Sequence, residues 1–583
     1  MTYQNDIQDA NKYLQQGNYK RCLKAALSAA KKSPRSAIAV NFAGIAAGAT
    51  GRPNDAIKYF QKALKLQPDF PDAEKNLAQT LILVGRADTA LVVLNKMAKK
   101  TPQDWKIWFL TAQAELTLGL EKQALISTDK ALAMQSTLAT LHHLRSTINL
   151  SLGLIKDAIV DLQNALRLNP EDVTALTNLS LPLARQTRSQ EALEVVEKAV
   201  ALAPANLPAR LRLATQYVEI GRPDDGIYHY RAVLDIQQDH PAALEQLSYL
   251  LSKEDVAALE PKIRAAMKKV AKNSADRACL MYALSAALVA QNEQAEADKM
   301  LGLANHEMAQ LNPYHPDVDA DVTDAILARF PAPFVPEAKA GPACRPVFVI
   351  GLPRSGTTLV EAMLGAHPQV VPLGERGTAG FLLRDIIEQD LPFTCKDAAA
   401  LAEQDQGLLP ELPEGTLAYV DKMPENYRLI GFLKTAYPDC RIINLRRDPR
   451  DIALSMWKSH FSGTVLSYTY NWGWMAAKFN LYAKSMAHWH RVLPRQVLDV
   501  AYEQLVADVE GTGRRMAVFC DLSWDSAMAR PDLSTEQVLT LSATQLRRPV
   551  HTGSVGKWRG NTDLLTPFID RLDRAYWGEY LDT

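Results

Sequence analysis

Small residues return at a fixed period of 34 residues along the N-terminal part of this 583-residue chain. The recurring alanines are Ala56, Ala90, Ala124, Ala158 and Ala192. The recurring glycines are Gly17, Gly51, Gly85, Gly119, Gly153 and, after Thr187 replaces one of them, Gly221; the prolines are Pro34, Pro68, Pro102, Pro170 and Pro204. Glycine accepts the left-handed turn between two helices, alanine lets two helices approach closely, and proline ends a helix. The period therefore predicts seven stacked helix pairs over residues 3–240.

One period, residues 37–70, resembles a tetratricopeptide repeat. Its signature positions are filled by Gly44, Gly51, Ala56, Phe60, Ala63 and Pro68. The resemblance implies an all-α solenoid over residues 1–312, whose last part, 241–312, is degenerate because terminal repeats cap the stack. Repeat arrays of this kind usually bind protein segments, so we favour a peptide-binding groove. A scaffold that holds the protein together, or forms a homodimer, stays open as the alternative.

Charge and cysteine usage narrow the class of protein. The chain has 65 Lys and Arg against 65 Asp and Glu, so it lacks the overall basic field typical of a nucleic-acid-binding protein. Its six cysteines are scattered without a CxxC pair, which fits a reducing compartment. The N-terminus lacks the apolar core of a signal peptide, and we find no run of about 18 apolar residues that would span a membrane. We expect a soluble, cytoplasmic protein.

The pattern changes after a proline-rich connector at residues 313–345, which we expect to be extended and to contain one short helix. PVFVIG at 346–351 is an apolar, β-branched run that predicts a buried parallel strand, and 358–366 predicts the helix after it. Further strand-like runs occupy 417–421, 441–446 and 497–503, with helical segments between them. This alternation predicts a second, α/β domain over residues 346–583, with a parallel sheet covered by helices.

The stretch GLPRSGTT at 351–358 lies between the first predicted strand and its helix. It has the G-x-x-x-x-G frame of a phosphate-binding loop, in which backbone N–H groups at a helix N-terminus favour an anion. The lysine that normally follows the second glycine is replaced by Thr357, while Arg354 lies inside the loop. An ATPase or kinase needs that lysine, so the loop favours a phosphate or sulfate that is not hydrolysed around magnesium.

The string PRSGTTL, followed by AHP and GE, resembles the 5′-phosphosulfate loop of sulfotransferases, specifically the tyrosylprotein sulfotransferase branch. The resemblance covers about residues 341–570. It implies a P-loop-like α/β fold, the donor 3′-phosphoadenosine 5′-phosphosulfate (PAPS) and no metal. It assigns the donor's 5′-phosphate to Arg354, Ser355, Gly356, Thr357 and Thr358.

The second phosphate of the donor also has counterparts in this chain. The family binds the 3′-phosphate with an arginine and with a serine eight residues later. RRDPRDIALS supplies both at that spacing, as Arg447 and Ser455. The stretch from 541 to 560 resembles the family as well, and it implies Lys557 near the 3′-phosphate and Ser542 near the transferring group. VAYEQLV implies that Tyr502 contacts the nucleotide, although a core aromatic side chain is nearly as good an interpretation.

Catalytic roles follow from the same resemblance. Glu375 matches the general base, and Lys422 in DKMPEN matches the lysine that neutralises charge on the bridging oxygen. Arg354 and Ser542 complete the set of catalytic residues that the resemblance implies. His367 and His460 are rival bases, because cytosolic sulfotransferases use histidine. We rank both below Glu375.

The resemblance leaves the acceptor open. The branch that prefers acidic peptides carries arginines two and six residues after the base, where this chain has Gly377 and Phe381; Arg376 and Arg384 are shifted. The acceptor hydroxyl could belong to a protein tyrosine, a carbohydrate or a metabolite, and the repeats favour a protein or peptide. A repeat scaffold with an inactive nucleotide fold is the non-enzymatic alternative, but every expected catalytic position is filled.

Overall fold

The computed structural model describes residues 2–336, 344–461, 463–533, 537, 539 and 546–582, and it forms two compact units, Met1–Ala175 and Leu176–Thr583. Within the described ranges, no helix is both long enough and apolar enough to cross a membrane.

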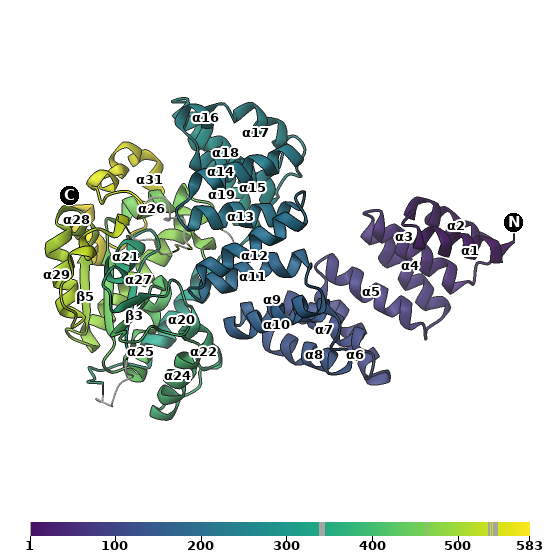
Figure 1. The fold of residues 1–583 in the computed structure, drawn as a ribbon, viewed down its shortest axis with the longest axis horizontal. Coiled ribbons are helices and arrows are strands. Elements are labelled where there is room, and N and C mark those ends of the chain that lie inside the picture. Colours follow the sequence, from purple (N-terminus) through teal and green to yellow (C-terminus); the bar gives the residue numbers. More distant parts are fainter. Residues whose placement is uncertain are drawn as a thin grey trace. The chain divides into compact units, whose positions relative to one another are not determined.

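The first unit consists of helix pairs of almost constant length (Figure 1). They are α1 (Tyr3–Gln15) and α2 (Tyr19–Lys32), α3 (Ala37–Ala49) and α4 (Pro53–Leu66), α5 (Pro71–Leu83) and α6 (Ala87–Lys100), α7 (Trp105–Thr117) and α8 (Glu121–Met134), α9 (Ala139–Ser151) and α10 (Ile155–Leu168). The turn glycines have positive φ, for example 75° at Gly51; Thr187, which replaces the turn glycine in the second unit, also has a positive φ of 58°. Ala56, Ala90, Ala124 and Ala158 are fully buried between helices. The predicted all-α solenoid is confirmed.

The second unit begins with further helices. These are α11 (Val173–Arg185), α12 (Ser189–Leu202), α13 (Leu207–Glu219), α14 (Pro223–Ile236), α15 (Pro241–Leu250), α16 (Lys253–Ala257), α17 (Glu260–Met267), α18 (Ala275–Ala290), α19 (Gln294–Leu311) and α20 (Pro316–Ala328). The helix expected in the connector is α20. Phe330, just after it, stacks edge-on against Phe432 and Trp489 of the α/β core, so this segment is packed rather than extended.

A parallel sheet follows, as predicted, and it has five strands in the order β2-β3-β1-β4-β5. Its strands are β1 (Arg345–Gly351), β2 (Val370–Pro372), β3 (Ala418–Asp421), β4 (Arg441–Arg446) and β5 (Val497–Ala501). Four of them lie at the predicted positions. The edge strand β2 was missed, because three residues are too few to show an apolar period.

Helices cover both faces of this sheet. They are α21 (Thr357–Gly365), α22 (Thr378–Leu382), α23 (Arg384–Glu388), α24 (Cys395–Gly407), α25 (Ile430–Ala436), α26 (Pro449–Trp457), α27 (Trp472–Val492), α28 (Tyr502–Ala507), α29 (Val509–Phe519), α31 (Thr562–Ile569) and α32 (Arg574–Leu581), with 3₁₀ turns at Pro424–Leu429, Ser467–Tyr470, Ser526–Ala529, Pro531–Leu533, Thr552–Ser554 and Lys557–Asn561.

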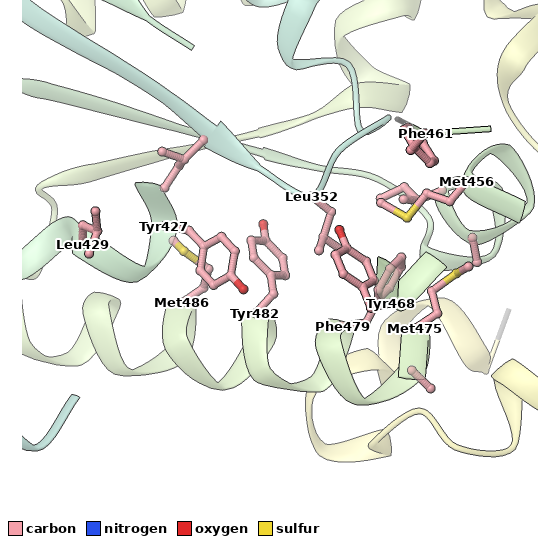
Figure 2. Packing of buried hydrophobic residues seen from close by; sticks show 14 of the residues in the cluster. Leu352, Tyr427, Leu429, Met456, Phe461, Tyr468, Met475, Phe479, Tyr482 and Met486 are labelled. Atoms are coloured by element: carbon pink, nitrogen blue, oxygen red, sulfur yellow. The ribbon is translucent and has the colours of Figure 1, made fainter. Parts of the chain in front are cut away.

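The larger core lies on the α27 side of the sheet (Figure 2). Tyr427 and Tyr482 meet edge-on there, and Phe479 packs in the same layer. Met281 and Tyr282 of α18 and Leu301 of α19 belong to the same buried cluster. The last repeat helices and the α/β domain therefore share one hydrophobic core, which gives them a common rigid base.

Candidate active site

The loop between β1 and α21 has the backbone of an anion-binding turn. Gly351, Arg354 and Gly356 all have positive φ, at 147°, 68° and 109°. A Cβ at Gly356 would lie 2.5 Å from Cδ2 of Tyr502, and a Cβ at Gly351 would lie 2.8 Å from the carbonyl oxygen of Leu445. Both glycines are therefore required by close contacts, and these contacts hold the loop against the ends of β4 and β5.

Two arginines meet at this loop. Arg354 Nε donates a hydrogen bond to Ser455 Oγ at 3.0 Å, and Arg447 Nη1 donates to the backbone oxygen of Arg354 at 3.0 Å. The Arg447 guanidinium lies 4.4 Å from the ring centroid of Tyr502. Burial, together with the neighbouring Arg447 charge, lowers the pKa of Arg354 to about 10. A partly buried cation and a buried one so close together favour an anion between them.

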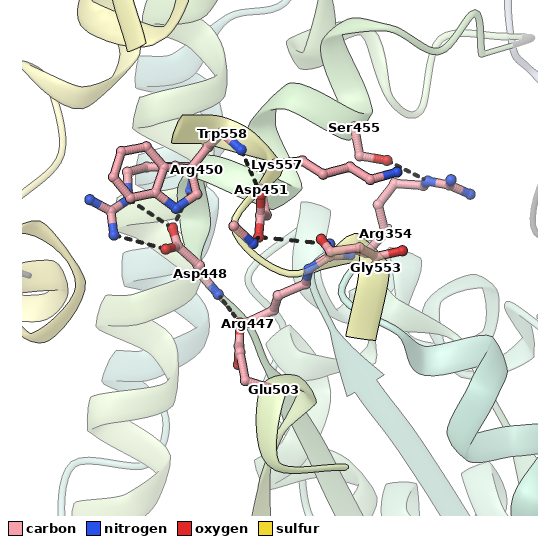
Figure 3. A network of polar contacts seen from close by, with 12 residues as sticks. Arg354, Arg447, Asp448, Arg450, Asp451, Ser455, Glu503, Gly553, Lys557 and Trp558 are labelled. Atoms are coloured by element: carbon pink, nitrogen blue, oxygen red, sulfur yellow. Dashed lines mark hydrogen bonds and ion pairs between the residues drawn. The ribbon is translucent and has the colours of Figure 1, made fainter. Parts of the chain in front are cut away.

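Asp451 of α26 ties a third segment to these arginines (Figure 3). Its carboxylate accepts hydrogen bonds from the backbone N–H groups of Gly556 at 2.7 Å and Trp558 at 3.0 Å. Arg447 Nη2 donates to the Ser554 carbonyl oxygen at 2.6 Å. In Figure 3 the side chain of Lys557, between the two residues held by Asp451, extends toward Ser455 and Arg354. Sequence reasoning missed Asp451, because its partners lie more than 100 residues away.

Buried donors remain available at this position. Ser355 Oγ and Arg447 Nε are buried and have no hydrogen-bond partner among the described residues. Buried polar atoms are normally satisfied, so such orphans need a partner. An anion on the loop would accept from both, and a nucleotide phosphate therefore fits the residues present. Thr357 and Thr358 open α21 beside them.

A second group of charges lies where β2 and β3 end. Lys422 Nζ donates to Glu375 Oε1 at 2.6 Å and lies 4.0 Å from Glu361 Oε2. The Lys422 side chain is 1% exposed and that of Glu375 is 47% exposed. Glu361 accepts from the Gly374 N–H at 2.7 Å, and burial raises its pKa. The lysine is thus held rigidly, while the Glu375 carboxylate can still reach a ligand from solvent.

The carboxyl ends of parallel strands share one edge of a sheet, and ligands bind at that edge in open α/β folds. The β1 loop, Arg447 after β4, Tyr502 after β5 and Lys422 after β3 all follow strand ends. The structure thus brings both charged groups to the same edge. Ser542 lies outside the described residues.

The arginines near Glu375 in the sequence have other partners. Arg376 forms a buried ion pair with Asp405 at 2.9 Å, and Asp405 also accepts from Tyr437 Oη at 2.8 Å. The Arg384 guanidinium lies 5.7 Å from the ring centroid of Phe381. Arg376 therefore anchors the segment after Glu375 to α24.

Both rival histidines have partners. His367 is 2% exposed, its Nε2 lies 3.3 Å from Ser523 Oγ, and its Nδ1 accepts from the Gln369 N–H at 3.2 Å. His460 Nδ1 lies 2.9 Å from Glu245 Oε1 on α15. The imidazole rings of His367 and His460 are therefore oriented by residues other than Lys422.

Two parts of the chain match known protein families. Residues 346–526 match the family described as "Sulfotransferase family", and residues 8–71, 49–116 and 147–206 match tetratricopeptide-repeat families. The chain thus joins a tetratricopeptide-repeat array to a sulfotransferase-family domain.

Individual relatives are distant. An uncharacterized protein of Aquifex aeolicus (strain VF5) is 29% identical over 41% of this chain and 34% of its own length. Protein-tyrosine sulfotransferase A of Caenorhabditis elegans is 24% identical over 39% of this chain and 66% of its own. The matches therefore span between one third and two thirds of these relatives. A solved thermophilic TPR protein of Thermus thermophilus aligns at 26% identity over 31% of this chain and all of its own, with a TM-score of 0.29.

Proposed function

We propose that the chain transfers a sulfuryl group from PAPS to an acceptor hydroxyl. The observation that carries this proposal is the joint placement of a two-arginine anion site and a Glu375–Lys422 pair at one sheet edge. A phosphate site alone suits many nucleotide-binding proteins. A buried lysine paired with a half-exposed carboxylate adds what group transfer needs, a cation for the leaving oxygen and a base for the attacking one.

Each residue has a role in this proposal. The loop, through Arg354, Ser355, Gly356, Thr357 and Thr358, holds the 5′-phosphate. Arg447, Ser455 and Lys557 hold the 3′-phosphate, and Tyr502 packs beside the nucleotide. Ser542, by family resemblance, lies near the transferring group.

In the proposed reaction, the acceptor oxygen forms a bond to sulfur while the bond between sulfur and the bridging phosphate oxygen breaks. The acceptor's proton passes to Glu375, and the negative charge on the departing bridging oxygen is stabilised by the Lys422 ammonium. The products are the sulfate ester and the 3′,5′-bisphosphate of adenosine. This chemistry works by positioning and electrostatics, and no metal ion takes part.

We propose that the acceptor hydroxyl belongs to a protein or peptide, with tyrosine as one candidate. The repeats support this choice, because such arrays expose concave surfaces suited to extended segments. Carbohydrate or metabolite hydroxyls are the alternative acceptors. Six free cysteines are consistent with a reducing compartment, so we assign the reaction to the cytoplasm.

Donor binding provides the first test. Arg354→Ala and Arg447→Ala should each weaken binding of adenosine 3′,5′-bisphosphate by about 1.5–3 kcal/mol, because each removes a charged contact to phosphate. Isothermal titration calorimetry without added magnesium measures this loss. Arg514→Ala is the matched control, since this exposed arginine pairs with Glu510 away from the loop. Unchanged affinity in both loop variants would refute the donor assignment.

The role of the repeats is tested by truncation. Helices α18 and α19 share the core of the α/β domain, so a cut near residue 313 would expose that core. A fragment of residues 169–583 removes α1–α10 and keeps the second compact unit whole. We expect it to bind the nucleotide normally and to lose turnover of the natural acceptor, measured with labelled donor and cell extract. Equal turnover by the folded fragment would leave the first unit a scaffold.

A further inference from the structure

A buried cluster of three metal-ligand side chains lies where the repeat helices meet the α/β domain. Glu245 comes from α15, Cys279 from α18 and His460 from the segment after α26. One donor atom of each lies within 4.8 Å of the other two. Cys279 Sγ lies 2.9 Å from Glu245 Oε2, and His460 Nδ1 lies 2.9 Å from Glu245 Oε1. Three elements far apart in the chain thus converge on one point.

The surroundings hold these donors in place. Glu245 is 5% exposed and Cys279 6% exposed. Tyr249 Oη donates to Glu245 Oε1 at 3.2 Å, and the ring of Tyr282 stacks on His460 with centroids 5.0 Å apart. Groups that hydrogen-bond to or pack on the ligands orient metal sites in general. The only ion pair that Glu245 makes with another described residue is with His460, so no lysine or arginine compensates this buried carboxylate.

We propose that Glu245, Cys279 and His460 bind a zinc ion. Thiolate, imidazole and carboxylate together are a donor set for zinc, whereas calcium and magnesium take oxygen donors alone. Zinc lies about 2.0–2.3 Å from such donors, which separates tetrahedral ligands by about 3.3–3.8 Å. The present spacing reaches that geometry after the 2.9 Å contacts open slightly.

Zinc binding would change the protonation of the site. Without a metal, burial and the Glu245 carboxylate raise the pKa of Cys279 well above its usual range, so the thiol donates its proton to that carboxylate. A bound divalent ion reverses this preference and deprotonates the thiol. Each zinc bound therefore releases the Cys279 proton to solvent, and the ion replaces it as the partner of the Glu245 carboxylate.

The ion would have a structural role. Three protein ligands leave the fourth position to a water molecule. The zinc would join α15 and α18 to the segment just after α26, five residues beyond Ser455, which bonds to Arg354. It would thereby fix the repeat helices against the element that carries part of the anion site, without contacting the reacting atoms.

The test uses the full-length chain freed of metal by a chelator and then titrated with Zn²⁺ or Co²⁺. We expect one zinc per chain by elemental analysis, and with Co²⁺ a thiolate-to-cobalt absorption band. Cys279→Ser should abolish that band. His460→Gln and Glu245→Gln should each weaken zinc affinity by at least about 10-fold, since even groups that only orient ligands cost that much. Cys440→Ser, at a buried cysteine outside the cluster, should keep both stoichiometry and band.

Two results would overturn the proposal. The first is a folded wild-type chain that takes up no zinc. The second is a cobalt spectrum without a thiolate band, or one unchanged by Cys279→Ser, which would place the ion elsewhere. Because the readouts are stoichiometry and absorption, neither depends on the sulfotransferase proposal.

Discussion

Replacing Glu375 by glutamine is expected to lower turnover by about 10²–10⁴-fold, the usual contribution of general-base catalysis. Glutamine keeps the size of the side chain, and its amide oxygen can still accept the hydrogen bond from Lys422 Nζ. It cannot take the acceptor's proton. Affinity for adenosine 3′,5′-bisphosphate should stay nearly constant, because Arg354 and Arg447 are untouched. Steady-state kinetics with labelled donor, together with calorimetry, measures both quantities.

Two comparisons separate this assignment from its rivals. Glu388→Gln, at the exposed last residue of α23, is the matched control and should turn over normally. If Glu375→Gln kept normal turnover while His460→Gln abolished it, histidine would be the base. His460→Gln also removes a ligand of the proposed zinc ion. Cys279→Ser is the control for that effect, because it removes another zinc ligand and leaves the His460 imidazole in place.

Replacing Lys422 by methionine is expected to lower turnover by about 10²–10³-fold, the loss seen when one preorganised group that stabilises transition-state charge is removed. Methionine fills the same buried space without a charge. The bridging oxygen then departs without its cation, so the chemical step slows while the phosphate contacts persist. Single-turnover measurements isolate that step from product release.

The control for this variant is a second buried lysine. Lys434 is fully buried, and its Nζ donates to the carbonyl oxygens of Pro438 at 2.8 Å and Cys440 at 3.1 Å. Lys434→Met should lower stability but leave turnover of the folded enzyme unchanged. An equal loss of turnover in both variants would show that the effect of Lys422→Met comes from removing a buried charge. A Lys422→Met enzyme with normal turnover would remove the lysine from the mechanism.

The local features of this chain could be read from its sequence. The helix pairs were predictable, since most repeats place the same alanine and glycine at the same step of a 34-residue period. The β1 strand and the start of α21 were also predictable, because an apolar run, a glycine-rich turn and a helix follow one another directly. Strand β5 was predicted two residues too long, since Tyr502 begins α28 instead.

Contacts between distant residues were decided by the tertiary structure. Lys422 meets Glu375 across 47 residues, Arg354 meets Ser455 across 101, and His460 meets Glu245 across 215. Family resemblance named the first four of these residues but could not place them in contact, and nothing in the sequence pattern indicated the cluster of Glu245, Cys279 and His460. Sequence periodicity reports only which face of a local element is buried. Which buried faces then meet depends on how helices and strands pack around a common core, and in this chain that packing brings the charged groups together.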